Sequence, residues 1–253
     1  MNIKMLALDL DGTLLRDDKT ISVRTIRTLD ECRNKGVKIV CATARANIKD
    51  IVPDGLLDGS VLSSGAVVEV DGDIISHKTM NIDHVRSFLI AVNKMGYAMS
   101  AGRNDGFRCA NYHFTENSGY TIDSKMVDYT KIDFDPDKIY VITETPESVE
   151  FVKKYAPSDI HLFISRDHIS FFFHKDAVKS KGVAFLAEHW GLNQSEIAGF
   201  GDDIVDLEFL QYCGVGVAVA NALDEVKAIA DCICDTNEND GVAKWLEENV
   251  LCN

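Results

Sequence analysis

The first residues that could do chemistry are two aspartates near the N-terminus. Asp9 and Asp11 lie at the end of an apolar run in residues 6–15 (LALDLDGTLL) and are followed at once by Gly12 and Thr13. Alternate residues of a strand share a side, and glycine permits a tight exit from the strand. Two carboxylates on one side repel each other and resist burial, so the pattern predicts a cation between them. A solvated strand end with an Asp-Gly turn is the alternative.

A second acidic group follows another apolar segment much later in the chain. The sequence GDDIVD at residues 201–206 contains Asp202, Asp203 and Asp206. Aspartate is a preferred helix N-cap, which would account for one or two of the three but not for acids at the ends of two buried strands. Ligands collect at the carboxyl ends of parallel strands. The two groups together therefore predict a hard divalent cation with oxygen ligands, and Mg²⁺ is the first candidate.

Two more polar residues stand where strands and helices are expected to meet. Thr43, in VCATAR, ends an apolar run, and its hydroxyl could bond a phosphate oxygen or cap a helix. Lys181, in KSKG, opens a predicted helix, where the helix dipole disfavours a cation. A lysine at this position indicates a nearby anion, and a solvated surface lysine is the alternative.

The segments that carry these residues alternate between strand and helix. Near-continuous apolar runs at residues 4–10 and 37–43 are typical of strands buried on both faces. Between them, residues 22–36 have apolar residues at helical spacing, with Ser22 as N-cap and Gly36 to close the helix. Two such strands joined by a helix predict a right-handed βαβ unit in a parallel sheet.

The middle of the chain has a different pattern. After an Asp71-Gly72 hairpin turn, a helix is predicted over 81–95, and short strands then outnumber helices. The strand–helix alternation resumes near residue 179. We therefore predict an α/β fold: a Rossmann-like parallel sheet core flanked by helices, formed by residues 1–80 and 178–253, with an inserted α+β cap domain at 81–177.

Composition limits the classes of function. The chain has 253 residues, 46% of them hydrophobic, and a net charge of -14, which disfavours binding to nucleic acid. No apolar run approaches the ~20 residues of a membrane span, and no cleavable signal pattern is found, so we expect a cytoplasmic protein with no membrane partner. Seven cysteines without a paired C-x-x-C set argue against zinc and for reduced thiols. Monomer and homodimer both stay open.

The order and spacing of the motifs resemble the haloacid dehalogenase (HAD) superfamily. DLDGTLL resembles its first motif, Thr43 its second, Lys181 its third and GDDIVD its fourth. The insertion resembles the large α+β cap (C2B-like) of the Cof-type sugar-phosphatase branch. The segment CGVGVAVANALDEVKAIAD also resembles the C-terminal signature of that branch. The resemblance implies a Mg²⁺-dependent phosphatase that hydrolyses phosphate monoesters of small metabolites, sugar phosphates above all.

The resemblance also implies roles for residues. Asp9 would be the nucleophile that forms an aspartyl-phosphate, and Asp11 would be the acid and then the base. Asp9, the backbone carbonyl of Asp11, and Asp202 would hold Mg²⁺, and Asp206 would complete or orient that set. The phosphate oxygens would be bound by Thr43 and Lys181.

The sequence also contains candidate substrate contacts, and positions that differ from the usual pattern of the family. Candidate substrate residues are Arg45, Arg103, Asn104, Arg108 and Asn221, three of them in the cap, which would exclude water and choose the substrate. Val205 stands where the family usually has asparagine, and Ala44 and Ser64 replace a common glycine and asparagine. Val205 leaves open a degenerate protein that binds a phosphorylated ligand without turnover. A phosphomutase also stays open, because phosphomannomutases have a similar cap and nucleophile.

Overall fold

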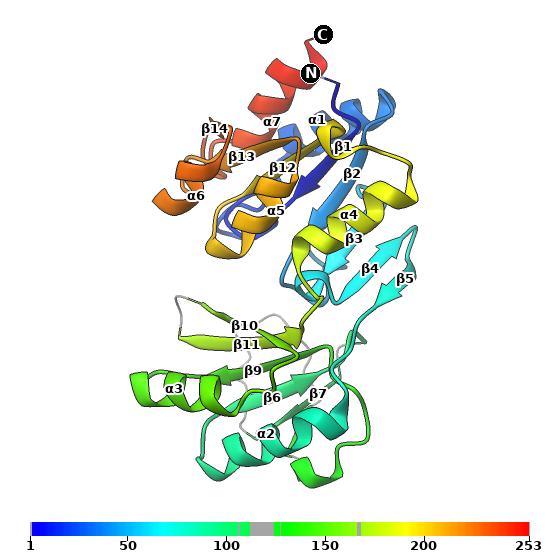
Figure 1. Cartoon of the computed structure of the whole chain (residues 1–253). Helices are drawn as coiled ribbons and strands as arrows, with labels where there is room; N and C mark the ends of the chain where they lie inside the picture. The colour runs from blue at the N-terminus through cyan, green and yellow to red at the C-terminus, as the bar shows by residue number, and fades with distance from the viewer. Residues whose placement is uncertain (1, 106, 112–123, 127, 166–167, 253) are drawn as a thin grey trace. The chain divides into compact units, whose positions relative to one another are not determined.

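The structure is a computed structural model that describes residues 2–105, 107–111, 124–126, 128–165 and 168–252. The chain divides into two compact units (Figure 1). The first consists of Met1–Ser76 and Val178–Asn253, and the second of His77–Ala177. The sequence placed these boundaries at residues 80 and 177.

The first unit is built on an eight-stranded sheet with the order β14-β13-β12-β1-β2-β3-β4-β5. The central strand β1 pairs in parallel with both β2 and β12, and its residues are all buried, as its apolar run predicts. β12–β13, β13–β14 and β2–β3 are also parallel pairs, whereas β4 runs antiparallel to β3. The strands span Met5–Leu8 (β1), Lys38–Ala42 (β2), Gly59–Leu62 (β3), Val67–Val70 (β4), Asp73–His77 (β5), Ile197–Gly201 (β12), Val215–Val219 (β13) and Cys232–Cys234 (β14).

Helices flank both faces of this sheet. Their bounds are Val23–Asn34 (α1), Lys179–His189 (α4), Leu207–Tyr212 (α5), Asp224–Ile229 (α6) and Gly241–Leu246 (α7). α1 packs beside α7 on one face, while α4, α5 and α6 lie on the other (Figure 1). Ser22 caps α1 by accepting a hydrogen bond from the backbone N–H of Thr25, as predicted. The Rossmann-like α/β fold is therefore confirmed.

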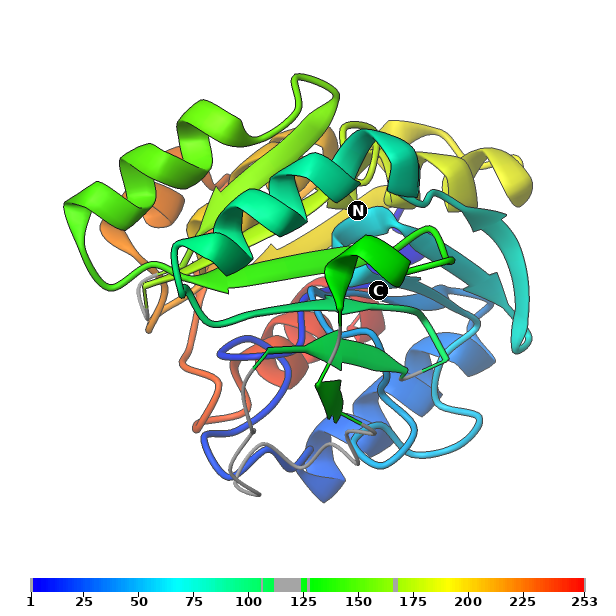
Figure 2. The ribbon, with the colours of Figure 1, turned by 90° about the horizontal axis from the view of Figure 1, so that it is seen from below.

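The second unit contains a six-stranded sheet with the order β10-β11-β9-β6-β7-β8. Neighbouring strands are antiparallel except for β7 and β8, which pair in parallel. Helices α2 and α3 contact each other and cover the same face of the sheet (Figures 1 and 2). The elements span Ile82–Lys94 (α2), Met99–Gly102 (β6), Arg108–Ala110 (β7), Ser124–Met126 (β8), Lys138–Ile142 (β9), Pro146–Tyr155 (α3), Ile160–Ile164 (β10) and Ile169–His174 (β11).

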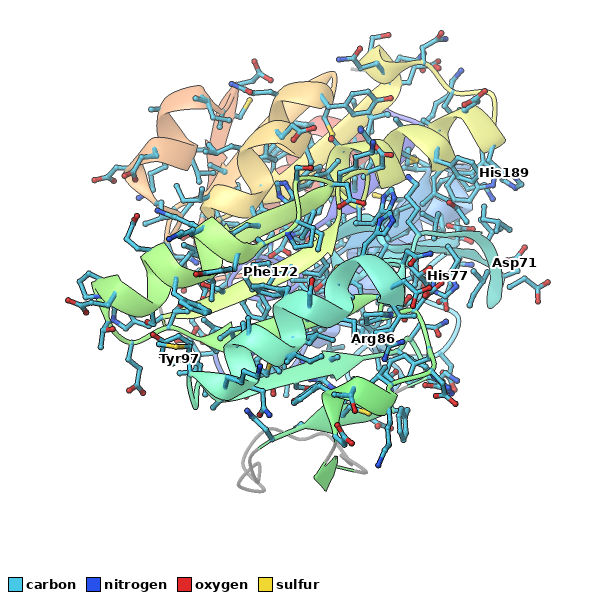
Figure 3. The ribbon with its side chains drawn as sticks, turned by 60° about the horizontal axis from the view of Figure 1, so that its bottom comes forward. Asp71, His77, Arg86, Tyr97, Phe172 and His189 are labelled. Atoms are coloured by element: carbon cyan, nitrogen blue, oxygen red, sulfur yellow. The ribbon has the colours of Figure 1, made fainter. Side chains whose placement is uncertain are left out.

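Aromatic packing holds α2 onto this sheet. The ring centroid of Phe88 on α2 lies 4.9 Å from that of Phe172 on β11, and both side chains are buried. Figure 3 labels Phe172 and, on α2, Arg86. Arg86, on the same helix, donates hydrogen bonds to the carbonyls of Thr130 and Ile132. The second unit therefore has its own hydrophobic core.

Short turns complete the fold. Asp71 and Gly72 both have positive φ, 52° and 86°, as in the type I′ turn that the Asp-Gly pair predicts between β4 and β5. Single 3₁₀ turns occur at Ser63–Gly65, Tyr129–Lys131, Gln194–Glu196 and Ile204–Asp206, and a π-helical turn follows α7 at Glu247–Leu251. None of the helices in the described ranges combines the length and apolar character that a membrane crossing needs.

Candidate functional site

Three strand ends meet at one edge of the first sheet. Asp9 follows β1, Thr43 follows β2, and Asp202 follows β12. β1 lies between β2 and β12 and is parallel to both, so the residues that follow these strands emerge side by side. The backbone N–H of Asp9 donates to the carbonyl of Phe200 at 2.9 Å, which ties the first motif to the fourth.

Three carboxylates converge there. Oxygens of Asp9, Asp202 and Asp206 all lie within 4.8 Å of one another. Asp206 is fully buried and Asp9 is 6% exposed. Gly12 leaves room for this cluster: its φ is +78°, and a Cβ there would lie 2.5 Å from Oδ2 of Asp202.

The lysine in this cluster is Lys179, and the prediction of Lys181 for that place is corrected. Nζ of Lys179 lies 2.6 Å from Oδ1 of Asp9 and 2.7 Å from Oδ1 of Asp206. Its side chain is buried, whereas Lys181 is exposed. Residues two apart on a helix point about 200° away from each other, so only one of the two lysines can face the strand ends.

A signal for Lys179 was present in the sequence. Val183, Leu186 and Ala187 form the buried face of α4, and Lys179 lies four residues before Val183 on the same face. Helical spacing therefore places Lys179, and not Lys181, on the side of the helix that meets the sheet.

Asp206 uses both of its carboxylate oxygens inside the protein. Oδ1 accepts from Lys179, and Oδ2 accepts from the backbone N–H groups of Asp202 and Asp203 at 3.0 and 3.1 Å. Of the two roles predicted for Asp206, completing or orienting the metal ligands, this geometry favours orienting. Val205 precedes it within the Ile204–Asp206 turn and is half-buried.

The electrostatics of the cluster favour a bound cation. Burial raises the pKa of Asp9 well above its ordinary value, with Lys179 opposing the shift and the charges of Asp206 and Asp202 adding to it. Burial and the charge of Asp206 raise the pKa of Asp202 to about 6, against a hydrogen bond from Thr13. A set of oxygen donors whose mutual repulsion opposes ionisation fits a hard divalent cation, which would favour the charged forms.

Asp11 lies apart from the three clustered carboxylates. Nε and Nη2 of Arg45 each donate to its oxygens at 2.6 Å, and Nζ of Lys19 donates at 2.9 Å. Burial raises the pKa of Asp11, but the hydrogen bonds from Arg45 and Lys19 outweigh it and hold that pKa below its ordinary value. Arg45, predicted as a substrate contact, here binds the predicted acid/base residue.

Thr43 is buried and begins a loop, not a helix. None of residues 43–58, all of which are described, is helical. Its Oγ1 accepts from the backbone N–H of Arg45 at 3.2 Å, and its carbonyl accepts from Ser64 N–H at 2.9 Å. Ser64 therefore contacts the second motif through its main chain.

The strained turn between β3 and β4 contacts both this loop and the start of α4. Ser63, Ser64 and Gly65 have consecutive positive φ angles of 47°, 56° and 105°. A Cβ on Gly65 would lie 2.4 Å from the carbonyl oxygen of Val178, the residue before Lys179. Non-glycine residues rarely adopt such φ values, so Ser63 and Ser64 are strained. The surrounding contacts of the turn must stabilise it by more than this strain costs.

The remaining predicted substrate residues have other partners. Asn221 donates to the carbonyl of Gly12 at 2.7 Å. In the second unit, Arg103 forms an ion pair with Asp105 and lies over the ring of Phe107, Asn104 is half-buried in the same turn, and the guanidinium of Arg108 lies 5.9 Å from the ring centroid of Tyr140.

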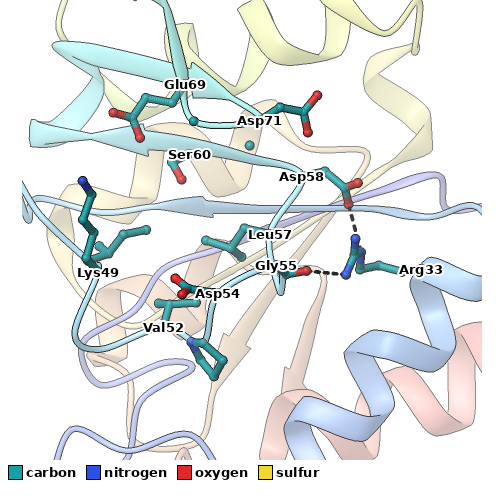
Figure 4. Close-up of a pocket in the computed structure, with 14 residues that line it drawn as sticks. Arg33, Lys49, Val52, Asp54, Gly55, Leu57, Asp58, Ser60, Glu69 and Asp71 are labelled. Atoms are coloured by element: carbon teal, nitrogen blue, oxygen red, sulfur yellow. Dashed lines mark hydrogen bonds and ion pairs between the residues drawn. The ribbon is translucent and has the colours of Figure 1, made fainter.

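A pocket of about 420 Å³ lies elsewhere on the first unit (Figure 4). It is lined by Gly59 and Ser60 at the start of β3, which is the end of that strand opposite the Ser63 turn. Arg33 donates to the carbonyl of Gly55 and pairs with Asp58, so these lining groups satisfy each other. Asp9, Asp202 and Asp206 do not line this pocket.

A Rossmann-like sheet with buried carboxylates and a lysine at its carboxyl edge, where α/β enzymes bind their ligands, is typical of an α/β enzyme with an acidic site. The chain belongs to the haloacid dehalogenase-like hydrolase family, whose model matches residues 6–246.

Individual relatives agree with this assignment. A Haemophilus influenzae protein classed by name among the phosphatases is 31% identical over 98% of each chain. A 5-amino-6-(5-phospho-D-ribitylamino)uracil phosphatase of Bacillus subtilis is 28% identical over 96% of each chain. A solved HAD-superfamily phosphatase from Bacteroides thetaiotaomicron has a TM-score of 0.84 and 25% identity, covering 97% of this chain and 94% of its own.

Proposed function

We propose that the protein is a Mg²⁺-dependent phosphatase of small phosphorylated metabolites, sugar phosphates above all, and that it works through an aspartyl-phosphate on Asp9. The observation that carries the proposal is the contact of Lys179 with Asp9 and Asp206 at the carboxyl edge of the sheet. It supports one buried carboxylate, Asp9, as the nucleophile, because Lys179 fixes its Oδ1 and leaves Oδ2 to attack phosphorus.

The first half-reaction transfers the phosphoryl group to Asp9. Oδ2 of Asp9 forms a bond to phosphorus while the bond to the ester oxygen breaks, and Asp11 in its protonated form gives that oxygen a proton. Lys179 and the hydroxyl of Thr43 bind phosphate oxygens, where transition-state charge spreads. Thr43 can donate because its oxygen already accepts from Arg45 N–H and its proton remains available.

The second half-reaction returns the enzyme to its starting state. Asp11, now a carboxylate, takes a proton from water, whose oxygen attacks phosphorus and releases phosphate from Asp9. The ion pairs of Asp11 with Arg45 and Lys19 stabilise this carboxylate form. Asp11 must exchange these partners to act as an acid in the first half.

Asp9, Asp202 and the backbone carbonyl of Asp11 would hold the metal, with Asp206 orienting the set. When bound, Mg²⁺ supplies positive charge that compensates these carboxylates and attracts the phosphate group. Chelation by EDTA should therefore abolish turnover, and added Mg²⁺ should restore it.

The substrate class is proposed from the relatives. The Bacillus subtilis relative is named for a phosphorylated ribityl compound, which is itself a sugar-alcohol phosphate. Release of inorganic phosphate from a panel of sugar phosphates, sugar-alcohol phosphates and p-nitrophenyl phosphate with Mg²⁺ tests the proposal. Isomer formation without phosphate release would indicate a phosphomutase.

Val205 motivates the second candidate, a protein that binds a phosphorylated ligand without turnover. Valine cannot donate or accept a hydrogen bond where the family usually has asparagine. Inactivity across the whole panel, together with saturable binding of a phosphorylated metabolite, would favour this candidate over the phosphatase.

Asp9→Asn separates the candidates further. The amide has the same shape but is a far weaker nucleophile, so we expect turnover to fall by at least ~10³-fold while the fold is kept. Asp203→Asn is the matched control, because Asp203 lies in the same acidic motif but outside the three clustered carboxylates. Wild-type rates in Asp9→Asn would exclude covalent catalysis through this residue.

A further inference from the structure

The loop that follows Asp11 is held by residues more than 200 positions away in the sequence. The side-chain amide of Asn237 donates to the carbonyl of Leu15 at 3.0 Å. The backbone N–H of Asn237 donates to Oδ1 of Asn221 at 3.0 Å, and Nδ2 of Asn221 donates to the carbonyl of Gly12 at 2.7 Å. Asn237 is only 6% exposed, so it is the buried member of this chain of hydrogen bonds.

Neighbours of Asn237 hold the next part of the same loop. Nη2 of Arg16 donates to Asp240 at 3.0 Å, and the backbone N–H of Asp17 donates to Oε1 of Glu238 at 2.7 Å. These contacts place a C-terminal turn against the loop along its length. These hydrogen bonds therefore restrict the motion of the loop as far as the turn itself is rigid.

The C-terminal turn is itself tightly closed. Asp240 has a φ of 56°, and a Cβ on Gly241 would lie 1.8 Å from the carbonyl oxygen of Asp235. Lys244 pairs with Asp235 at 2.6 Å across the turn. A turn closed in this way keeps Asn237 in one place.

We propose that Asn237, acting with Asn221, is a positioning residue for the metal-binding loop. This inference rests on the proposed function, in which the backbone carbonyl of Asp11 is a Mg²⁺ ligand. That carbonyl belongs to the peptide bond between Asp11 and Gly12, and Gly12 lacks the Cβ that would restrict its backbone. The hydrogen bond from Asn221 to the Gly12 carbonyl restrains the backbone of Gly12, directly after the Asp11–Gly12 peptide.

The other side of the loop is restrained by a different contact. Oγ1 of Thr13 donates to Oδ1 of Asp202 at 3.0 Å, which links the loop to a second proposed ligand. Asn221 and Thr13 thus restrain the segment just after Asp11 from two directions. Groups that orient metal ligands from outside typically affect metal affinity by ~10–100-fold.

Calorimetric titration with MgCl₂ tests the inference without measuring turnover. Asn237→Ala and Asn221→Ala should each raise the Mg²⁺ Kd by about tenfold. Asn237→Ala removes the side-chain bond to Leu15 but keeps the backbone N–H bond to Asn221, so the two variants test the restraints at Leu15 and at Gly12 separately. A role limited to folding would lower thermal stability and leave the Kd unchanged.

Asn239→Ala is the matched control. Asn239 lies in the same turn, but its amide donates to Asp235 and not to the loop, and it is exposed. Its Mg²⁺ Kd should equal that of the wild type. Asn221 is exposed, so Asn221→Ala should fold and keeps the test decisive even where loss of buried Asn237 impairs folding.

Three results are distinguishable. A tenfold rise in Kd in the two variants but not in Asn239→Ala supports the inference. Unchanged Kd in Asn221→Ala and Asn237→Ala overturns it and leaves the proposed function standing. Failure of the wild-type protein to bind Mg²⁺ overturns both, and only that result contradicts the metal-dependent phosphatase itself.

Discussion

Replacing Lys179 with methionine should show how strongly the buried carboxylates depend on one cation. Lys179→Met keeps an unbranched side chain, one atom shorter than lysine, and removes the charge from between Asp9 and Asp206. In the wild type, both carboxylates raise the pKa of Lys179 despite its burial, so the ammonium is firmly charged. Removal of one partner from a buried ion pair typically costs about 3–5 kcal/mol, because the remaining charges lose their compensation.

Lys181→Met is the matched control, since it makes the same substitution two residues away at an exposed position. Substitutions at exposed positions usually change stability by no more than ~0.5 kcal/mol. The two variants should therefore differ in the free energy of unfolding by at least about 2 kcal/mol.

Urea unfolding followed by tryptophan fluorescence is the assay. Both tryptophans, Trp190 and Trp245, belong to the first unit, so their signal reports on the unit that contains Lys179. The measurement is made at pH 7 in EDTA, so that no metal replaces the missing charge. If both variants unfolded within ~0.5 kcal/mol of the wild type, the argument that Lys179 compensates Asp9 and Asp206 would be refuted.

Two further predictions concern the carboxylate cluster. Because the pKa of Asp202 is raised to about 6, the metal-free protein should lose on the order of 2–3 kcal/mol of stability relative to Asp202→Asn as pH rises from ~4 to ~6, and saturating Mg²⁺ should remove this loss. Gly12→Ala should lower kcat/KM by roughly 100-fold, because its Cβ would displace Asp202. Gly36→Ala has a similar φ, +85°, but an open site, so it should share the backbone strain and keep its activity; equal loss in both would contradict the clash.

Much of the fold follows from local patterns. The apolar run of β1 is buried over its whole length, and Ser22 caps the helix that leads to β2. These features need only neighbouring residues, so the sequence alone could predict them. The meeting of Asp9 and Asp202 also followed, because parallel strands bring their carboxyl ends to one edge.

The lysine was misassigned for a physical reason. An argument from the helix dipole applies to any residue in the first turn of α4 and cannot distinguish Lys179 from Lys181. The buried face of the helix distinguishes them, since Lys179 shares it with Val183 and Leu186. Periodicity therefore carries more information than position within the first turn.

Other parts of the site depend on contacts that no local pattern contains. Arg45 reaches Asp11 across 34 positions, and Asn221 reaches Gly12 across 209. Each pairing depends on the strand order and on the exact path of a loop. The sequence could nominate Arg45 and Asn221 as polar residues near strand ends, but it could not show that their partners are other residues of the site.

The charge of the chain explains how an acidic protein could act on an anion. A net charge of -14 repels a long polyanion, which must cross much of the surface field to bind. A phosphate monoester is small, and it meets only the charges close to Asp9, because screening limits others to about 10 Å. Near that position the structure gathers Lys179, which contacts Asp9, and Arg45 and Lys19, which contact Asp11. We therefore expect the chain to repel nucleic acid and still to attract a small phosphate ester to this edge of the sheet.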